Sequence, residues 1–208
     1  MNHHSVRDKR DRNGDKRERI LGSAMRVFAS KGFFGAKVSD IAEDAGVADG
    51  TIYLYFKSKD DILISLFEEQ MEKVNSVLTS AMAGAATADA KLRSFVQAYM
   101  GLVAENRHAA EVITIELRQS AKFMKEYKNP RFAEFLKTLA AVIDEGQRRG
   151  TFRADVPAPV AARALFGALD ELALMWVTGR GEKLDIRKVA DWIGDLVIQG
   201  LVAKGGAP

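Results

Sequence analysis

The chain has 208 residues, of which 47% are hydrophobic and 28% are charged, a balance that suits a globular protein of one large or two small domains. It contains no cysteine, which excludes a disulfide framework, a thiol nucleophile and a thiolate metal site. No apolar run approaches the roughly 20 residues of a membrane span, and the charged N-terminus lacks the apolar core of a signal peptide, so we expect a soluble, cytoplasmic protein with no membrane segment.

The first residues form a charged, apolar-poor stretch. Residues 1–19 carry seven Lys or Arg against four Asp or Glu, and this surplus equals the net charge of +3 of the whole chain. Such a composition cannot bury enough surface to order itself, so we expect a disordered tail over residues 1–13. The tail is either a solvated extension or a basic arm that adds phosphate or minor-groove contacts to DNA.

The first helix is predicted over Asp15–Ser30, with an apolar stripe that Lys31–Gly32 ends. The stripe consists of Ile20, Ala24, Val27 and Phe28. Phe33 and Phe34 follow, and both are expected to fill the core at the corner after this helix.

The next stretch, Val38–Lys59, predicts two short helices that a tight turn separates. Its apolar residues recur at helical spacing up to Gly46 and resume after Asp49. Only glycine adopts a left-handed backbone without a steric penalty, so Gly46 is the expected turn. This pattern is typical of a helix-turn-helix, with Ile52 and Phe56 on the buried face of the second helix.

The remainder predicts further helices and no strand. Ser58 is expected to cap a long helix that ends near Ala83, with Asp61 as the acidic partner of a capping box. Small residues at 84–87 mark a break. The later candidates are residues 88–106, 109–120, 121–127, 130–149, 157–178 and 186–203. We therefore predict an all-α fold of roughly nine helices, with a DNA-binding domain over residues 1–57 and a larger helical domain over residues 58–208.

The last two predicted helices carry more apolar surface than one stripe requires. The first of them holds a long apolar series that ends at Trp176, and the second holds Trp192, Leu196 and their neighbours. A partner subunit would cover this surplus, which predicts a homodimer. The alternative is a large core within one monomer.

The N-terminal motifs resemble those of a known family. The run GVADGTIYLYFKSKDDIL, preceded by VFASKGF and VSDIAEDA, resembles the DNA-binding domain of the TetR family of bacterial repressors. The resemblance implies binding to a double-stranded DNA operator, and dimerisation through a four-helix bundle of the last two helices. It implies base-reading roles for Ala48, Asp49, Gly50, Thr51 and Tyr53, and phosphate contacts for Lys37, Ser39, Tyr55 and Lys59.

Two of these positions, Lys37 and Asp49, carry unexpected residue types. The family usually has a threonine cap where this chain has Lys37; lysine cannot cap a helix, so Ser39 is expected to share that task. Asp49 is an acid on the expected DNA-facing surface. It is either the N-cap of the second helix or an acceptor for a cytosine amino group.

Three further motifs resemble one branch of this family. IELRQS at residues 115–120, FGALDELALMWV at residues 166–177 and ADGTIYLYFKSKDDILISLF resemble the FadR-type repressors. The resemblance implies control of fatty-acid degradation genes and release of DNA on binding long-chain acyl-CoA. The alternative is a TetR-like repressor of an efflux or other metabolic operon that responds to a different apolar small molecule.

The second domain contains apolar and polar candidates for contact with such an effector. Each apolar candidate is either a lining residue or ordinary core, and the acids either form a structural network with arginine or lie near the ligand. In the second interpretation Arg118, with Lys122 or Lys125, meets a phosphate or the pantetheine arm of the ligand. The candidates are Met100, Val103, Ile113, Glu116, Leu117, Arg118, Phe123, Phe135, Leu139, Phe166, Leu169, Asp170, Ala173 and Trp176.

Enzymatic activity is not expected. The sequence has no glycine-rich phosphate loop, no nucleophile elbow and no paired histidines, so no catalytic residue is predicted. His3 and His4 lie in the expected tail and only His108 lies in an expected helix, which predicts no metal site. No cofactor is predicted besides the effector.

Overall fold

The computed structural model describes residues 4–179 and 185–203, with side chains from residue 14 onward. These residues form ten α-helices and one 3-10 helix, and the only β-type pairing among them is an isolated bridge between Phe152 and Val202, which confirms the all-α prediction. The helices are α1 (His4–Gly35), α2 (Val38–Asp44), α3 (Asp49–Ile52), α4 (Lys59–Ala83), α5 (Ala88–Glu105), α6 (Arg107–Thr114), η1 (Glu116–Gln119), α7 (Ala121–Lys125), α8 (Pro130–Arg148), α9 (Ala158–Val177) and α10 (Ile186–Leu201).

The chain divides into two compact units. Unit 1 comprises Met1–Glu69 and Glu111–Tyr127, and unit 2 comprises Gln70–Ala110 and Lys128–Pro208. The expected boundary at residues 57/58 therefore differs from the structural one, because the start of α4 and the segment 111–127 belong to unit 1. None of the helices in the described ranges is long and apolar enough to span a membrane.

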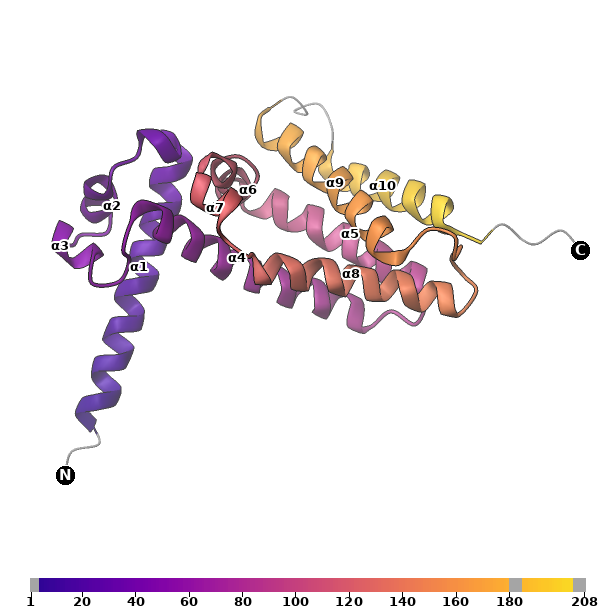
Figure 1. The fold of residues 1–208 in the computed structure, drawn as a ribbon, viewed down its shortest axis with the longest axis horizontal. Helices are drawn as coiled ribbons and strands as arrows, with labels where there is room; N and C mark the ends of the chain where they lie inside the picture. The colour runs from indigo at the N-terminus through magenta and orange to yellow at the C-terminus, as the bar shows by residue number, and fades with distance from the viewer. Residues whose placement is uncertain (1–3, 180–184, 204–208) are drawn as a thin grey trace, which may run out of the picture. The chain divides into compact units, whose positions relative to one another are not determined.

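Helix α1 starts earlier than the sequence predicted. Its backbone is helical from His4 (Figure 1), within the stretch for which the sequence predicted a tail. Lys and Arg are good helix formers, and acids that precede bases by four residues, as Asp15 precedes Arg19, favour an exposed helix. The structure does not describe residues 1–3 or the side chains of residues 4–13. The side chains of His3 and His4 and the expected DNA contacts of the tail therefore lie outside the described residues.

The regular part of α1 ends where the sequence predicted. Gly32 has φ 69° and ψ 163°, so it interrupts the helical backbone after Lys31. Phe33, which follows, is 4% exposed and belongs to the core, as expected. Phe34 is 73% exposed, so the expectation that it fills the core is wrong. The two rings pack edge to face with centroids 5.7 Å apart, and only one of them faces inward.

Helices α2 and α3 form the predicted helix-turn-helix beside α1 in unit 1 (Figure 1). Gly46 has φ 63°, which confirms its left-handed turn, and its N–H donates to the Glu43 carbonyl at 3.0 Å. Ile52 and Phe56 are buried as expected. Ser58 Oγ accepts from Asp61 N–H at 3.1 Å, and Asp61 accepts from Lys57 N–H at 2.8 Å, which confirms the cap of α4.

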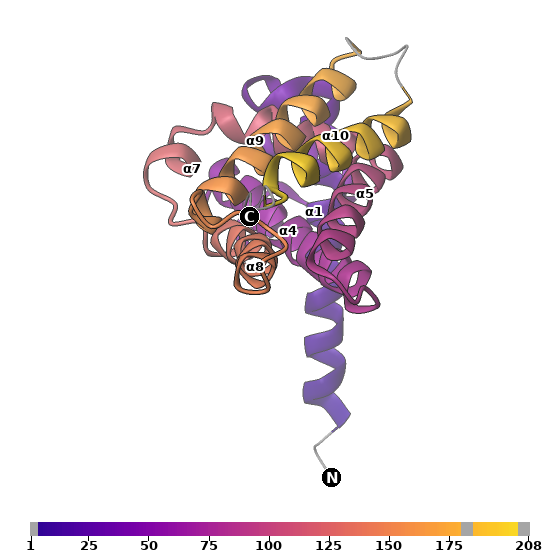
Figure 2. The ribbon, with the colours of Figure 1, turned by 90° about the vertical axis from the view of Figure 1, so that its right-hand side faces the viewer.

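In unit 2, α5 packs against α8, α9 and α10, and α8 also packs against α9 (Figure 2). Fully buried apolar side chains from these helices form the core, among them Leu92, Phe95, Leu139, Leu169 and Ala173. Polar contacts fix α10 on α5: Arg93 pairs with Asp195 at 2.7 Å, and Gln97 donates to Asp191 at 2.9 Å.

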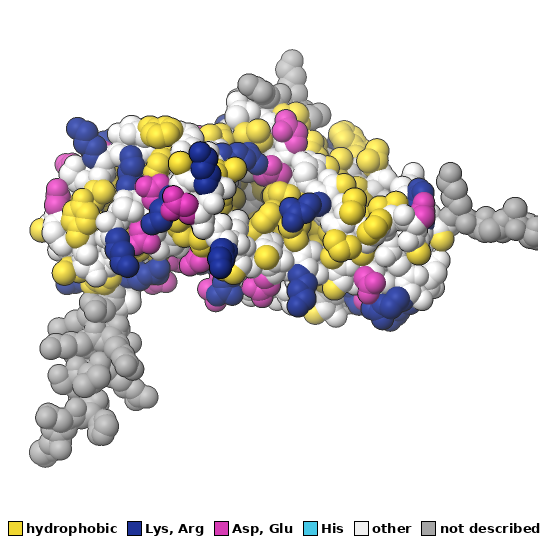
Figure 3. Space-filling model, viewed as in Figure 1, with side chains coloured by type: hydrophobic (Ala, Val, Ile, Leu, Met, Phe, Trp, Pro, Cys, Tyr) yellow, Lys and Arg dark blue, Asp and Glu magenta, His cyan; other side chains and the backbone are white. Residues whose placement is uncertain are grey.

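Several large hydrophobic side chains remain exposed among the described residues. On the face seen in Figure 3, yellow hydrophobic side chains lie between interspersed basic and acidic ones. The exposed ones in unit 1 are Phe34, Tyr53, Leu54 and Met124, and those in unit 2 are Val77, Val160, Trp192, Leu196 and Val202.

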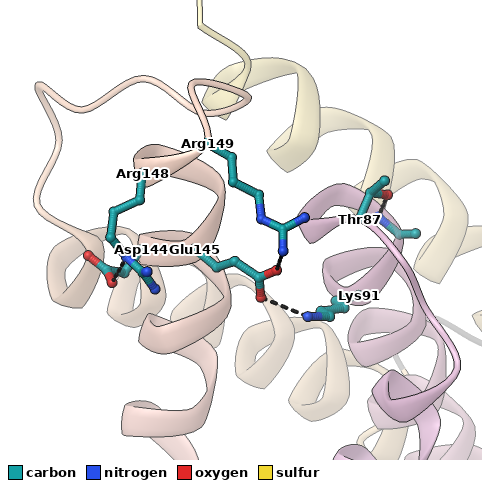
Figure 4. Close-up of polar contacts among 7 residues, drawn as sticks. Thr87, Lys91, Asp144, Glu145, Arg148 and Arg149 are labelled. Carbon is teal, nitrogen blue, oxygen red and sulfur yellow. Dashed lines mark hydrogen bonds and ion pairs between the residues drawn. The ribbon is translucent and has the colours of Figure 1, made fainter.

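A carboxylate between two cations ties α5 to α8. Glu145 Oε2 lies 2.7 Å from Lys91 Nζ, and Glu145 Oε1 lies 3.0 Å from Arg149 Nη2 (Figure 4). The hydrogen bond from Lys91, followed by the charges of both cations, lowers the pKa of Glu145 below its ordinary value. The neighbouring Asp144 pairs with Arg148 at 2.9 Å.

Candidate DNA-binding and effector-binding sites

Most of the DNA-contact candidates are accessible on unit 1. Side chains or backbone are exposed at Lys37, Ser39, Ala48, Asp49, Gly50 and Tyr53, while Thr51 and Tyr55 are half-buried. The buried Ile52 and Phe56 alternate with them and anchor the segment to the core. The sequence pattern therefore separates a buried from a presented side correctly.

Helix α2 is capped by an acid, Asp40, whose role was not predicted from the sequence. Lys37 occupies the N-cap position, and its side chain makes no capping hydrogen bond. Asp40 Oδ2 accepts from Lys37 N–H at 2.8 Å, and Asp40 Oδ1 lies 2.9 Å from Lys31 Nζ. These contacts, the backbone hydrogen bond first, lower the pKa of Asp40. The task expected of Ser39 thus falls to Asp40, and the spacing of three residues was the signal for it.

Asp49 is not the N-cap of α3. Ala48 occupies that position, without a side-chain hydrogen bond, and Asp49 is the first residue of the helix. The interpretation of Asp49 as the N-cap of this helix is therefore wrong. An acid in the first turn still complements the positive end of the helix backbone. Contact with a cytosine amino group stays a prediction.

Lys59 is held inside unit 1. Its ammonium donates to the carbonyl oxygens of Phe33 at 2.6 Å and Ala36 at 2.9 Å, and it lies 4.6 Å from the centre of the Phe33 ring. Two of the three ammonium protons are thus used, and the side chain is partly buried. This geometry opposes the expected phosphate contact and makes Lys59 a residue that fixes the corner between α1 and α2.

Leu54, which belongs to the apolar series that resumes after Asp49, is an accessible residue. It is 81% exposed, next to Tyr53, which is 59% exposed. The short α3 ends at Ile52, so helical periodicity no longer applies at Leu54. An exposed leucine at this point is suited to apolar contact with a thymine methyl group.

The effector candidates of unit 2 comprise buried core and an aromatic cluster. Met100, Val103, Phe135, Leu139, Leu169 and Ala173 are buried, whereas Phe166, Asp170 and Trp176 are half-buried. The Phe166 ring centre lies 4.7 Å from that of Phe132 and 5.6 Å from that of Phe135. Phe132 was missed, although its spacing of three residues from Phe135 on α8 indicated a shared face.

Trp176 has a polar neighbour that the sequence did not reveal. The Arg107 guanidinium lies 5.6 Å from the centre of the Trp176 ring, and Arg107 Nη2 donates to the Val177 carbonyl at 3.0 Å. Arg107 therefore satisfies a carbonyl at the C-terminal end of α9 while it covers an aromatic face.

The remaining candidates lie in unit 1, on the segment 111–127. Leu117 is buried, and Ile113 and Phe123 are half-buried; the Phe123 ring lies 5.0 Å from that of Phe67. Arg118, Lys122 and Lys125 are exposed, and Arg118 Nη1 donates to the Thr114 carbonyl. Glu116 is 7% exposed, and its carboxylate accepts hydrogen bonds from Phe33 N–H and Gln119 Nε2 within unit 1.

Helices α9 and α10 each present an outer face. On α10, Trp192 is 58% and Leu196 is 69% exposed, and on α9 Val160 is 57% exposed. The small residues Ala164 and Gly167 continue the exposed face of α9. Small and apolar residues on a helix face permit close packing of another helix.

Family comparisons cover almost all of the folded chain. Residues 20–66 match the model of bacterial regulatory proteins of the tetR family, and residues 67–200 match that of the C-terminal region of YsiA-like proteins. The chain belongs to the TetR family.

Within this TetR-family chain the two matched regions meet inside α4, at residues 66/67, close to the structural limit of unit 1 at Glu69. In the part with described side chains, no group of three or more His, Asp and Glu is arranged to hold a metal ion.

Relatives extend the similarity over both regions. The chain is 35% identical to the fatty acid metabolism regulator protein of Bacillus subtilis over 182 residues, which are 88% of this chain and 93% of that protein. It is similar to the crystal structure of the transcriptional regulator FadR from Bacillus subtilis in complex with stearoyl-CoA, with a TM-score of 0.82, 34% identity, and coverage of 88% and 98% of the two chains. The fatty acid degradation regulator FadR from Bacillus halodurans gives a TM-score of 0.80 at 34% identity over the same shares.

Proposed function

We propose that this TetR-family chain is a DNA-binding repressor of fatty-acid degradation genes. In this proposal a homodimer binds an inverted-repeat operator and releases it when long-chain acyl-CoA binds. The observation that carries the proposal is the similarity, over nearly the whole chain, to a regulator whose crystal structure contains stearoyl-CoA.

The presented side of α2 and α3 supports the DNA-binding part. Tyr53 and Leu54 offer an aromatic and an aliphatic contact to base edges, and Lys37 offers a charge to a phosphate. Ala48 and Gly50 carry no bulk that would hold the backbone away from the groove. In this assignment Lys59 contributes by fixing the corner and not by touching DNA.

The outer faces of α9 and α10 support the dimer. Their exposed Trp192, Leu196 and Val160 would be covered by the same faces of a second copy, which is the self-complementary arrangement of a two-fold axis. The helix-turn-helix segments (α2 and α3) of two copies related in this way would contact half-sites about one helical turn apart, roughly 34 to 36 Å.

The composition of the effector candidates supports an acyl-CoA. The aromatic cluster of Phe132, Phe135 and Phe166 offers an apolar environment for a hydrocarbon chain. In unit 1, Arg118, Lys122 and Lys125 are exposed cations of the kind that bind a phosphate.

The proposal is tested with DNA that the protein itself selects from a random pool of duplexes. The recovered sequences should contain an inverted repeat. Stearoyl-CoA should dissociate the complex with the selected duplex, whereas equimolar free CoA should not. Fluorescence anisotropy of the labelled duplex measures the dissociation. Selection of no duplex would reject the repressor, and release by free CoA alone would reject the acyl chain as the signal.

A further inference from the structure

The corner between α1 and α2 comprises residues 32–37. Charged side chains hold both the N–H and the carbonyl of one of its residues, Phe33. Phe33 N–H donates to Glu116 Oε2 at 2.5 Å, and the Phe33 carbonyl accepts from Lys59 Nζ at 2.6 Å. Both charges act on buried backbone, since Phe33 is 4% exposed. Hydrogen bonds to ionised partners are about twice as strong as neutral ones, so this corner is fixed more firmly than an ordinary turn.

Glu116 is enclosed by this arrangement. It is 7% exposed, and its Oε2 also accepts from Gln119 Nε2 at 2.9 Å. A side chain at Gly32 would place its Cβ 3.6 Å from Oε2, so the carboxylate lies directly against the residue whose φ of 69° breaks α1. A buried carboxylate needs such partners, and Phe33 N–H would lose its acceptor without it.

The position of this corner in the chain gives it influence over the DNA-facing helices. Gly32 interrupts the helical backbone of α1 shortly before α2 begins, and Ala36 N–H closes the turn on the Gly32 carbonyl at 3.1 Å. Lys59 binds the Ala36 carbonyl as well, at 2.9 Å. A change at the carboxylate therefore alters the direction in which α2 leaves α1, and with it the position of α3.

Glu116 reaches the corner from a segment that the sequence places far from it. It belongs to the segment 111–127, which has residues of unit 2 immediately before and after it in the chain. Two more side-chain contacts attach this segment to α4 within unit 1. Ser120 Oγ lies 2.5 Å from Asp60 Oδ1, and the Tyr127 hydroxyl lies 2.5 Å from Glu68 Oε1.

We propose that Glu116 is a positioning residue that holds the helix-turn-helix in its DNA-binding arrangement, and that the effector releases DNA by withdrawing its carboxylate from Phe33. The first part stands on the hydrogen bonds above, and the second part rests on the proposed function. A ligand that moves the segment 111–127 would remove the acceptor from the corner and needs no contact with DNA.

The test compares Glu116→Ala and Glu116→Gln with the matched control Glu126→Ala, which changes an exposed acid at the end of α7 in the same segment. Glu116→Ala removes the acceptor, whereas Glu116→Gln keeps a neutral one. We expect the affinity for the selected duplex to fall about tenfold or more in Glu116→Ala, less in Glu116→Gln, and not in Glu126→Ala. Circular dichroism verifies that each variant is folded.

Amide hydrogen exchange of Phe33 separates positioning from general loss of stability. In Glu116→Ala this amide should exchange faster while buried amides of α5 and α8 keep their wild-type rates. In the wild-type protein, stearoyl-CoA should accelerate exchange of the Phe33 amide. In Glu116→Ala, stearoyl-CoA should change both this exchange rate and the remaining DNA affinity by a smaller factor than in the wild type.

Three results would decide against parts of this account. Wild-type affinity and wild-type Phe33 exchange in Glu116→Ala would overturn the positioning role. Full release of the Glu116→Ala complex by stearoyl-CoA, by the same factor as in wild type, would overturn the withdrawal of the carboxylate. A wild-type protein that selects no duplex would reject the proposed repressor alone, because Phe33 exchange still tests whether Glu116 holds the corner.

Discussion

Lys59 illustrates how one contact changes the role of a charged residue. A lysine whose ammonium bonds to two carbonyls and rests on an aromatic ring loses rotational freedom and part of its hydration. Its charge therefore serves the fold of unit 1. Lys37, by contrast, is exposed and makes no capping bond, so its charge is available to a phosphate.

The two lysines should differ in the salt dependence of DNA binding. Lys59→Met should weaken binding to all duplexes and lower the melting temperature, with the slope of log Kd against log salt unchanged. Lys37→Met should leave the melting temperature nearly unchanged and reduce that slope by about 0.9. Anisotropy titrations between low and physiological salt measure both slopes. A reduced slope in Lys59→Met would show that Lys59 contacts a phosphate after all.

Tyr53 should contribute to sequence recognition. If the exposed ring contacts a base edge, Tyr53→Ala should weaken binding to the selected duplex by about 1 to 3 kcal/mol and binding to a random duplex by much less. The ratio of the two affinities is the measurement. An unchanged ratio would remove Tyr53 from the base-reading surface.

Some roles that depend on neighbours close in sequence were predicted. Gly46 and Ser58 act through backbone conformation and local hydrogen bonds, and both roles are confirmed. Lys59 and Glu116 act on Phe33 from 26 and 83 residues away, and no local pattern reports such contacts. The N-cap prediction for Asp49 was wrong for a different reason. At the start of a short helix, the N-cap and the first helical position are only one residue apart.

At the scale of elements, α2 depends on an ionised cap. Asp40 has a lowered pKa, from the Lys37 backbone hydrogen bond first and then from Lys31, so its stabilising effect is present above the unfolded-state pKa near 3.8 and is lost as pH falls through the lower folded-state value. Asp40→Asn should therefore lower the melting temperature of unit 1 at pH 7, and the deficit should shrink on acidification below about pH 4. Melting curves from pH 7 to pH 3 test this, and a deficit that is constant with pH would show that charge is irrelevant to the cap.

Helix α10 should carry the dimer. Trp192→Glu or Leu196→Glu places a charge on an exposed apolar face, so a self-complementary interface there would bring two such charges into apolar contact. We expect monomers that bind the full operator far more weakly, because one headpiece reads one half-site. Lys137→Glu, on the exposed side of α8, is the matched control. Light scattering of each variant gives the mass; a dimer that persists in both α10 variants would place the interface elsewhere.

At the scale of the molecule, periodicity predicted the all-α class and most helices, but not the division into units. Residues 109–120 were expected as one helix, whereas α6 ends at Thr114 and a 3-10 turn follows. This break lets Glu116 and Leu117 turn inward in unit 1. The spacing of apolar residues is compatible with one continuous helix or with a helix followed by a 3-10 turn. It indicates which side chains are buried, but not which part of the chain covers them.

The last prediction concerns the whole molecule as a sensor of chain length. If the acyl chain supplies most of the binding free energy, each added methylene contributes about 0.8 kcal/mol. Four methylenes, from 12 to 16 carbons, should then tighten binding by about 3 kcal/mol, or roughly two orders of magnitude. Linkage requires the same order in the concentrations that release the operator, since a ligand shifts the DNA equilibrium only through its differential affinity. Calorimetry with acyl-CoAs of 8 to 18 carbons, run beside operator release, measures both series. Affinity that is flat with chain length would exclude an apolar acyl site, whereas parallel steps in both series would place the hydrocarbon chain, and not the shared CoA, at the origin of the signal.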